Sequence, residues 1–379
     1  MRVVSKCIIL LYMKRELELY IHIPFCARKC GYCDFLSAPA EKSMQAAYVQ
    51  RLCREIEEAS GLAQVYEVST VFFGGGTPSL LDAGHIRRIM GTIKDYYPVR
   101  ADAEITLEAN PGTIDQEKLE IWREARINRL SMGLQSADNQ ELKLLGRIHT
   151  WEEFLDNYRL ARAAGFRNIN IDLMSALPGQ TCGGWRDTLL KVADLGPEHI
   201  SAYSLIVEEG TPFYNRYGEH PELLPTEEED RQMYGDTRTI LNRYGYERYE
   251  ISNYARPGYA CRHNLGYWNR TEYKGFGLGA ASLLENARTT NQSDLNKYLD
   301  GQYEGSREEL SEQAVREEYF FLGLRKMEGV DPGPYRGYYE KLLEKLTRQG
   351  LIVERNGRIC LTDRGIDVSN YVLARFLDD

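Results

Sequence analysis

Three cysteines, Cys26, Cys30 and Cys33, lie within the eight residues CARKCGYC. A structural zinc site needs four tetrahedral ligands, usually from two cysteine pairs, and here only His22 could be the fourth. A cluster of four irons and four sulfides also needs four ligands to be closed, so three thiolates leave one iron open to an external molecule. The spacing therefore favours an iron–sulfur cluster that receives a further ligand over a closed zinc site.

Glycines and polar residues recur where other predicted strands end. The second strand is followed by GGGT at 74–77, Glu108 closes the third, Gln135 closes the fourth, and Asp172 lies in the fifth. The carboxyl ends of parallel strands meet on one face of a barrel, where active sites are built. We therefore expect these residues and the cysteines to converge on one mouth.

The elements that position these residues alternate between strands and helices. Amphipathic helical segments such as AAYVQRLCREIEEAS separate short runs rich in β-branched and aromatic residues. The strand runs are 17–24, 68–73, 103–109, 129–136, 168–178 and 199–207. Such alternation is typical of a parallel sheet covered by helices, and we predict an α/β fold with a partial parallel (β/α)6 barrel.

The pattern changes twice after the barrel. A Tyr-, Gly- and Asn-rich stretch after about residue 245 predicts strands and an ordered loop, and the helices after about residue 307 are followed by a hairpin with Asn356 and Gly357 as its turn. The predicted divisions are an N-terminal extension (1–16), the partial barrel (17–245), a connecting region (246–305) and a small winged-helix-like α+β domain (306–379). We interpret the residues before Met13 as a start-site artefact.

Charge and hydropathy exclude several classes of partner. The net charge of −9 does not favour electrostatic binding of nucleic acid. In the winged-helix-like part, basic residues are interleaved with acidic ones, which favours packing against the barrel over DNA binding. No run of about eighteen apolar residues predicts a transmembrane segment, and CIILLY lacks a small-residue cleavage site. We expect a soluble cytoplasmic protein whose other cysteines are ordinary small apolar residues.

The CARKCGYC segment, at the end of the first predicted strand, is identified as the C-x3-C-x2-C mark of the radical S-adenosylmethionine (radical SAM) superfamily. The resemblance implies that Cys26, Cys30 and Cys33 hold a [4Fe-4S] cluster. It also implies that S-adenosyl-L-methionine (SAM) occupies the open iron through its amino and carboxylate groups. In that superfamily, one-electron reduction can cleave SAM to a 5′-deoxyadenosyl radical.

The segments YIHIPFC and GGGTP resemble the coproporphyrinogen-oxidase-like branch of this superfamily. The positions that the resemblance assigns to SAM binding are Tyr20, Tyr32, Gly75, Gly76, Thr77, Glu108, Gln135, Arg147 and Asp172. An arginine suits a carboxylate, and carboxylates suit ribose hydroxyls or an amine. For Arg147, in a helical or loop region, the alternative is a solvated position.

Two features separate the subfamilies of this branch. The motif of oxygen-independent coproporphyrinogen III oxidases is C-x3-C-x2-C-x-C. It has a further cysteine at the position where this chain has Phe35. These oxidases also carry a longer segment before the first strand, whereas nineteen residues precede Tyr20 here. Both departures favour the HemW-type haem chaperones.

The distant segment CRHNLGYWNR matches the H-N-x-x-Y-W motif that is implicated in haem binding by HemW-type proteins. The motif is met by His263, Asn264, Tyr267 and Trp268. Neutral imidazole is a standard axial ligand of haem iron, and aromatic rings can cover the porphyrin face. The alternatives are that His263 and Trp268 only fasten a loop under the barrel mouth, or that Cys261 supplies a thiolate ligand.

The resemblance implies a haem chaperone that carries a [4Fe-4S] cluster and SAM, binds haem and delivers it to haem-requiring apoproteins, plausibly membrane respiratory enzymes. The cluster would govern oligomerisation or haem transfer more than catalysis, and a homodimer is compatible with this interpretation. Coproporphyrinogen oxidase activity is not expected. The main alternative is a radical SAM oxidase that decarboxylates coproporphyrinogen III in haem synthesis, and a third is a radical SAM enzyme with another substrate.

Overall fold

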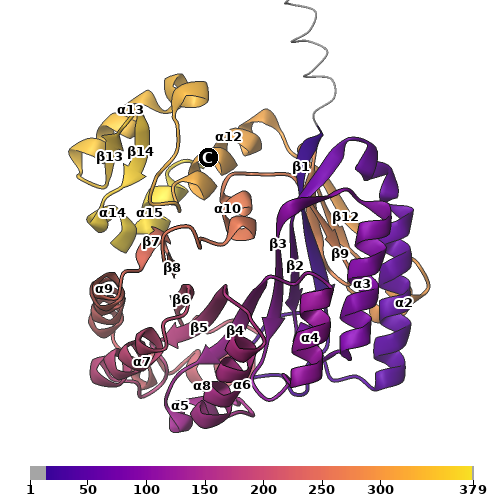
Figure 1. The fold of residues 1–379 in the computed structure, drawn as a ribbon. Coiled ribbons are helices and arrows are strands. Elements are labelled where there is room, and N and C mark those ends of the chain that lie inside the picture. Colours follow the sequence, from indigo (N-terminus) through magenta and orange to yellow (C-terminus); the bar gives the residue numbers. More distant parts are fainter. Residues whose placement is uncertain (1–13, 378–379) are drawn as a thin grey trace, which may run out of the picture.

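The structure, a computed structural model, describes residues 14–377, so the expected start-site artefact before Met13 lies outside the described residues. Six parallel strands form the centre of a twelve-stranded sheet, in the order in which they occur along the chain (Figure 1). They are β1 (Arg15–Ile23), β2 (Tyr66–Gly75), β3 (Val99–Ala109), β4 (Arg129–Gln135), β5 (Ile169–Ser175) and β6 (His199–Ser204). Each predicted strand run overlaps one of these six strands.

Helices cover the outer face of this sheet (Figure 1). They are α2 (Lys42–Glu58), α3 (Ala83–Tyr96), α4 (Gln116–Glu124), α5 (Asn139–Leu145), α6 (Trp151–Ala163), α7 (Cys182–Asp194) and α9 (Glu227–Arg243), with short 3-10 turns η1 (Ser60–Gln64), η2 (Pro78–Leu80) and η3 (Pro221–Leu223). The short helix α8 (Pro212–Tyr217) lies against the cysteine loop, where the Phe213 N–H donates to the Gly31 carbonyl. The parallel strands curve without closing on themselves, because further strands extend both edges. The predicted partial (β/α)6 barrel is confirmed.

Alternation along the strands separates the core from the lumen. In β1, Leu17, Leu19 and Ile21 are fully buried in the hydrophobic core under the helices. The residues that alternate with them along β1 point to the opposite face, and two of these, Glu18 and His22, are polar and also buried. A parallel strand covered on both faces is usually apolar throughout, so polar residues on the inner face indicate a polar lumen.

The sheet extends beyond the barrel through a region whose pairing the sequence did not indicate. Strand β9 (Tyr273–Phe276) pairs parallel with β1, and β8 (Asn253–Ala255) pairs antiparallel with β6. The remaining elements of this region are β7 (Glu247–Glu250), α10 (Arg262–Trp268), β10 (Ala281–Leu284), β11 (Ala287–Asn291), α11 (Leu295–Leu299) and β12 (Glu304–Glu309). The HNLGYW segment therefore lies on a short helix, α10, and the prediction of an ordered loop is wrong there.

The C-terminal part has a hydrophobic cluster of its own, which includes Phe320, Tyr339 and Phe376. Its elements are α12 (Glu312–Gly323), η4 (Gly333–Tyr335), α13 (Arg336–Arg348), β13 (Ile352–Arg355), β14 (Arg358–Leu361), α14 (Asp363–Asp367) and α15 (Ser369–Ala374). Asn356 and Gly357 have φ angles of 50° and 76°, as a two-residue type I′ hairpin turn requires. Among the helices of residues 14–377, none has the length and apolar character needed to span a bilayer.

Candidate functional site

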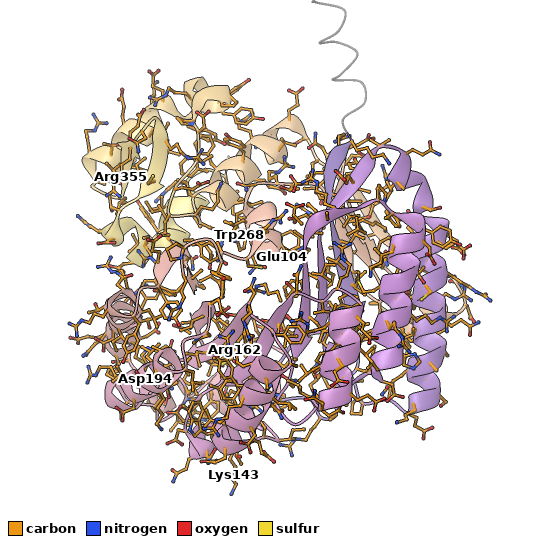
Figure 2. The ribbon with its side chains drawn as sticks, in the orientation of Figure 1. Glu104, Lys143, Arg162, Asp194, Trp268 and Arg355 are labelled. Carbon is orange, nitrogen blue, oxygen red and sulfur yellow. The ribbon has the colours of Figure 1, made fainter. Side chains whose placement is uncertain are left out.

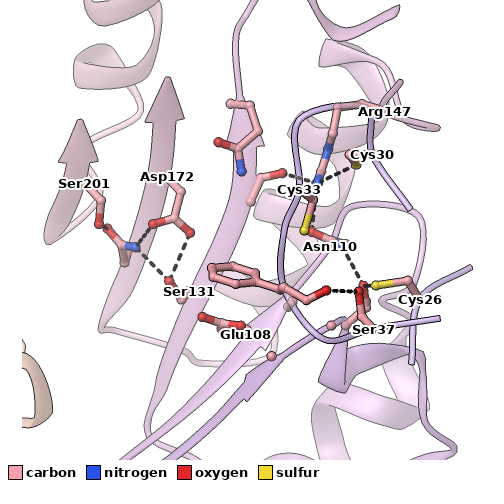
Figure 3. Close-up of a pocket in the computed structure, with 18 of the residues that line it drawn as sticks. Cys26, Cys30, Cys33, Ser37, Glu108, Asn110, Ser131, Arg147, Asp172 and Ser201 are labelled. Carbon is pink, nitrogen blue, oxygen red and sulfur yellow. Dashed lines mark hydrogen bonds between the residues drawn. The ribbon is translucent and has the colours of Figure 1, made fainter. Parts of the chain in front are cut away.

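A cavity of about 460 Å³ lies inside the barrel, with its mouth at the carboxyl ends of the parallel strands (Figure 3). Three cysteines lie on one side of it, Asp172, Ser131 and Ser201 lie on the other, and Glu108 lies between them. The predicted positions that line the cavity are Cys26, Cys30, Tyr32, Cys33, Gly75, Gly76, Thr77, Glu108, Gln135, Arg147, Asp172 and Asn264. The fold therefore brings residues from five strand ends together, as the sequence predicts.

The three thiols are free and half-buried, and two of them face hydrogen-bond donors. Thr77 Oγ1 lies 3.5 Å from Cys26 Sγ, and the Arg147 guanidinium lies 3.8 Å from Cys30 Sγ. Burial raises the pKa of the Cys33 thiol, whereas a nearby cation favours a thiolate. Thiolates held beside donors in a shared cavity fit the sulfur ligands of an iron–sulfur cluster.

A single metal ion fits these thiols less well. In the part of the chain that the structure describes, no group of three or more Cys, His, Asp or Glu side chains is arranged to hold one ion. His22, the candidate fourth zinc ligand, pairs instead with the Leu36 carbonyl at 3.0 Å and with the Tyr20 hydroxyl at 3.1 Å. Because a four-iron cluster binds each thiolate to a different iron, it does not require the three sulfurs to meet at one point.

The glycines after β2 are required by close packing. Gly75 has a φ angle of +110°, and a Cβ there would lie 2.5 Å from the His22 ring. A Cβ on Gly76 would lie 2.7 Å from the Phe25 carbonyl oxygen. The end of β2 therefore approaches β1 too closely for side chains, and both glycines line the cavity.

Arg147 lies in the loop just after α5 and faces the cavity, so the alternative of a solvated position is wrong. Its guanidinium donates to Asn110 Oδ1 at 2.8 Å and to the Gly133 carbonyl at 2.5 Å. Hydrogen bonds to neutral acceptors leave its positive charge available to a carboxylate. The chain turns into this loop through Gly146, whose φ angle of +80° ends α5 in the left-handed conformation.

Two carboxyl groups in the cavity wall have raised pKa values. Burial, reinforced by the charge of Asp172, raises the pKa of Glu108 to about 8. Burial also raises the pKa of Asp172, which accepts hydrogen bonds from Ser131 at 3.2 Å and from Asn170 at 2.8 Å. A carboxyl group near its pKa can donate or accept a hydrogen bond, as a pair of ribose hydroxyls requires.

Gln135 and Tyr20 occupy different places relative to the cavity. Gln135 ends β4 with a φ angle of +74° and accepts a hydrogen bond from the Tyr203 hydroxyl at 3.2 Å. Such a φ angle in a residue other than glycine costs about 1–3 kcal/mol and is common at ligand sites. Tyr20 packs beside Phe72 in the strand layer, and its hydroxyl pairs with His22, so it supports the wall.

The HNLGYW segment lies at the other end of the lumen, against the amino-terminal halves of β1 to β3. In Figure 2, Glu104 and Trp268 lie near α10, far from Lys143 on α5. Helix α5 is beside the mouth, because the Leu145 carbonyl accepts a hydrogen bond from the Gly31 N–H of the cysteine loop. The segment therefore lies beneath the mouth, at the far end of the same lumen, where Asn264 lines the cavity.

His263 is fully engaged inside the protein. It is 1% exposed, its Nδ1 lies 2.7 Å from Thr70 Oγ1, and its Nε2 lies 3.0 Å from the Tyr267 hydroxyl. Its ring stacks on Phe72, and burial followed by the charge of Arg129 lowers its pKa to about 3. The imidazole is neutral, as iron ligation requires, but in this arrangement neither nitrogen is open and His263 fastens α10 to β2.

Asn264, Trp268 and the preceding Cys261 contact different parts of the protein. Asn264 lines the cavity, whereas the ring of Trp268 lies under the Arg325 guanidinium at 4.3 Å, facing the C-terminal part. Cys261 is buried, its thiol donates to Glu104, and burial raises its pKa to about 12. A neutral thiol is a poor metal ligand, so the structure disfavours Cys261 as a thiolate ligand.

Two acidic residues outside the sequence motifs, Glu18 and Glu104, lie against α10. Glu104 accepts hydrogen bonds from the backbone N–H groups of Arg262 and His263, so it places a carboxylate at the amino end of α10. Glu18 is 2% exposed, and burial raises its pKa to about 9. The sequence pattern that could have indicated these buried acids is a glutamate inside each of the strand runs LELYIHI and AEITLEA, at a position that alternates with apolar ones.

We predict that Glu18→Gln stabilises the protein in a pH-dependent manner. Between the ordinary pKa of 4.5 and the folded value of about 9, the unfolded chain releases the Glu18 proton and the folded chain keeps it. The free energy of unfolding of the parent therefore falls as the pH rises, and glutamine removes this loss. Urea unfolding at pH 8 should show a gain of up to about 5 kcal/mol that vanishes near pH 4.5. An equal difference at both pH values would contradict the raised pKa.

Comparison with known proteins defines the class and then the family. The Radical SAM superfamily model matches residues 20–192, and the HemN C-terminal domain model matches residues 310–368. Coproporphyrinogen III oxidase (HemN) from Escherichia coli, described as a radical SAM enzyme, has a similar structure with a TM-score of 0.83 and 25% identity, covering 96% of this chain and 90% of that chain. The fold and the cysteine-lined cavity thus define a radical SAM protein.

Curated relatives narrow this class. The chain is 36% identical to "Heme chaperone HemW" of Lactococcus lactis, covering 97% of this chain and 99% of the relative. It is 35% identical to "Heme chaperone HemW" of Bacillus subtilis, covering 95% and 99%. The chain belongs to the HemW family, and the prediction made from CARKCGYC, Phe35 and HNLGYW is confirmed.

Proposed function

We propose that this protein is a haem chaperone that holds one [4Fe-4S] cluster and SAM at the mouth of the barrel, binds haem through the HNLGYW segment, and passes haem to haem-requiring proteins. The observation that carries the proposal is the continuity of one lumen. Its cavity is lined at the mouth by Cys26, Cys30 and Cys33 and at the floor by Asn264 of that segment. The names of the similar HemW proteins support the haem part of the proposal.

In this proposal the three thiolates bind three irons, and the fourth iron receives the amino and carboxylate groups of SAM. When bound, the cluster supplies a single electron to SAM. Arg147 binds the SAM carboxylate, because its guanidinium faces the cavity beside Cys30. The remaining proposed SAM contacts are Tyr32 beside the cluster, Gly75, Gly76 and Thr77 at the methionyl group, and Glu108, Gln135 and Asp172 at the hydroxyls and amine. Tyr20, which the resemblance also assigned to SAM, supports the wall through Phe72 and His22.

Haem ligation by His263 requires a local rearrangement. Iron can reach Nε2 only after the contact with Tyr267 is broken, and Nδ1 only after the contact with Thr70 is broken. Each such hydrogen bond contributes about 1 kcal/mol net, so breaking either contact of His263 is within the reach of haem binding energy. Tyr267 and Trp268 would then supply rings for the porphyrin face.

The proposed location, oligomeric state and recipients come from the resemblance to HemW-type proteins. The protein acts in the cytoplasm, as a monomer or a homodimer, and its recipients are haem-requiring apoproteins, membrane respiratory enzymes among them. The cluster and SAM govern oligomerisation or transfer of haem to these recipients.

An anaerobic haem titration of the cluster-reconstituted protein tests the proposal. We expect binding of about one haem per chain with the visible spectrum of a histidine-ligated iron, and loss or change of that spectrum in His263→Ala. His220→Ala is the matched control, because His220 is exposed and pairs only with Glu222 among the described residues. Binding no stronger than nonspecific partitioning would reject the chaperone, and an unchanged spectrum in His263→Ala would reject only this ligand.

A second candidate, coproporphyrinogen III oxidase, is favoured by the structural similarity to HemN. Phe35 argues against oxidase activity, because it stands where the oxidase motif has a further cysteine. Its side chain is 62% exposed at the cavity wall. Anaerobic incubation with coproporphyrinogen III, reductant and SAM separates the two functions. We expect no decarboxylated product, and formation of protoporphyrinogen would establish the oxidase.

A further inference from the structure

Arg129, the first residue of β4, is a buried cation without a complete set of partners. It is 2% exposed, and its Nε is buried with no hydrogen-bond partner among the described residues. The acidic groups whose charges reach it are Glu104 and Asp172. Glu104 is bonded to the amino end of α10, and Asp172 is bonded to Ser131 and Asn170. Neighbouring acidic groups raise the pKa of Arg129 despite its burial, so the guanidinium stays charged and its unbonded Nε is a charged donor that a ligand can use.

Arg129 lines the same cavity as the cysteines, but at its floor. Successive inward residues of β4 lead from Arg129 to Gln135 at the mouth, six residues or about 20 Å along the strand. Asn253 and Asn264 line the floor with Arg129, and Asn253 Oδ1 is also buried without a partner. Asn253 Oδ1 only accepts hydrogen bonds, so the unused donor at the floor is Arg129 Nε, far from the proposed SAM carboxylate contact at Arg147.

We propose that Arg129 binds a carboxylate at the floor of the lumen, and that this carboxylate is a propionate of haem. A guanidinium offers a planar fork of N–H donors that matches a carboxylate in two parallel hydrogen bonds. Haem combines an iron, an apolar ring and two propionates, so a histidine on α10 and an arginine on β4 at the same end of the lumen suit two parts of one molecule. The inference rests on the proposed function.

The position of Arg129 beside α10 supports this assignment. The charge of Arg129 acts on both His263 and Cys261, which lie at the amino end of α10. Asn264, the neighbour of His263, lines the cavity together with Arg129. A ligand that reaches His263 from the lumen therefore passes Arg129. The carboxylate of SAM has the same chemistry, and the experiment distinguishes the two sources.

The test compares haem, haem dimethyl ester and iron-free protoporphyrin IX as ligands of the cluster-reconstituted full chain under anaerobic conditions. Arg129→Gln should weaken haem and protoporphyrin IX binding by about 10- to 100-fold, the loss expected for a charge-assisted double hydrogen bond. Binding of the dimethyl ester, which has no propionate charge, should be equal in parent and variant. His263→Ala should weaken haem but leave protoporphyrin IX binding unchanged, which separates iron ligation from propionate binding.

Other outcomes overturn the inference in distinguishable ways. An equal loss for haem and its dimethyl ester in Arg129→Gln would show that Arg129 does not bind a propionate. A loss of SAM affinity with unchanged porphyrin affinity would assign the carboxylate to SAM. If the parent binds neither haem nor protoporphyrin IX, the proposed function fails together with the inference. Thermal unfolding and the iron content of Arg129→Gln and Arg129→Met check that folding and the cluster are intact, and Arg129→Met should reproduce the glutamine result.

Discussion

Cys33→Ala should reduce the iron and sulfide content of the reconstituted protein from about four of each per chain to near zero. With three thiolates the cluster already has one iron without a protein ligand, and removal of Cys33 leaves two such irons. Among residues 14–377 the cavity wall offers no replacement thiol, because Phe35 stands two residues further along the chain and Cys53, Cys182, Cys261 and Cys360 do not line this cavity. Iron and sulfide analysis with visible absorbance after anaerobic reconstitution measures the effect.

Cys53→Ala is the matched control. Cys53 is 7% exposed on α2, and burial raises the pKa of its thiol, so it packs as a small apolar residue. Its replacement should leave the iron content unchanged and should cost about 1 kcal/mol of stability or less. Full iron content in Cys33→Ala, or an equal loss in both variants, would contradict the assignment of the cluster to the CARKCGYC segment.

The central sheet could be predicted because its information is local. Each strand run is short, rich in β-branched residues and separated from the next by an amphipathic helix, which permits parallel pairing in chain order. The carboxyl ends of such strands must meet, so Glu108, Gln135 and Asp172 could be assigned to one cavity without coordinates. The predicted convergence of these residues on one cavity is confirmed because it depends on strand ends alone.

The floor of the lumen could not be predicted because it depends on pairing between distant segments. Strand β9 joins β1, more than 240 residues earlier, and this pairing brings α10 into the barrel. Helix α10 spans seven residues, too few for a stable isolated helix, and its segment includes glycine and aromatic residues with modest helix propensity. It forms because Glu104 holds its amino end and His263 is bonded to Thr70, contacts that no local pattern encodes.

The same local reasoning overlooked Arg129. In RLSMGLQ the arginine precedes an apolar run and resembles an ordinary charged residue before a strand. Only the alternation of β4, with Ser131, Gly133 and Gln135 also lining the cavity, shows that its side chain points inward. Buried charges of this kind are recognised from their missing partners, which a sequence does not display.

Gly266→Ala should destabilise the protein by about 1–3 kcal/mol, the cost typical of overpacking a buried contact. A Cβ at this position of α10 would overlap the Glu18 carboxyl group. Glu18 is 2% exposed and is enclosed by its strand neighbours, so its carboxyl has little room to retreat. Urea unfolding near pH 6 measures the change, at a pH where burial keeps Glu18 protonated.

Gly91→Ala supplies the control for the helix effect of the substitution. Gly91 lies inside α3, and a Cβ there meets no atom within 4 Å, so alanine should stabilise by about 0.5–1 kcal/mol through its higher helix propensity. The two variants thus have opposite expected signs for the same chemical change. Gain of stability in Gly266→Ala would show that α10 is not pressed against Glu18.

Haem binding gives the Gly266→Ala variant a second readout. If α10 must leave β2 before His263 can bind iron, a substitution that pushes α10 away from Glu18 lowers the free energy of that release. Gly266→Ala should then bind haem faster than the parent while being less stable, and Gly91→Ala should bind at the parental rate. Stopped-flow mixing with haem measures the association rate. A variant that is destabilised but binds haem no faster would mean that release of α10 does not limit ligation, and the route of haem to His263 would have to lie through the lumen.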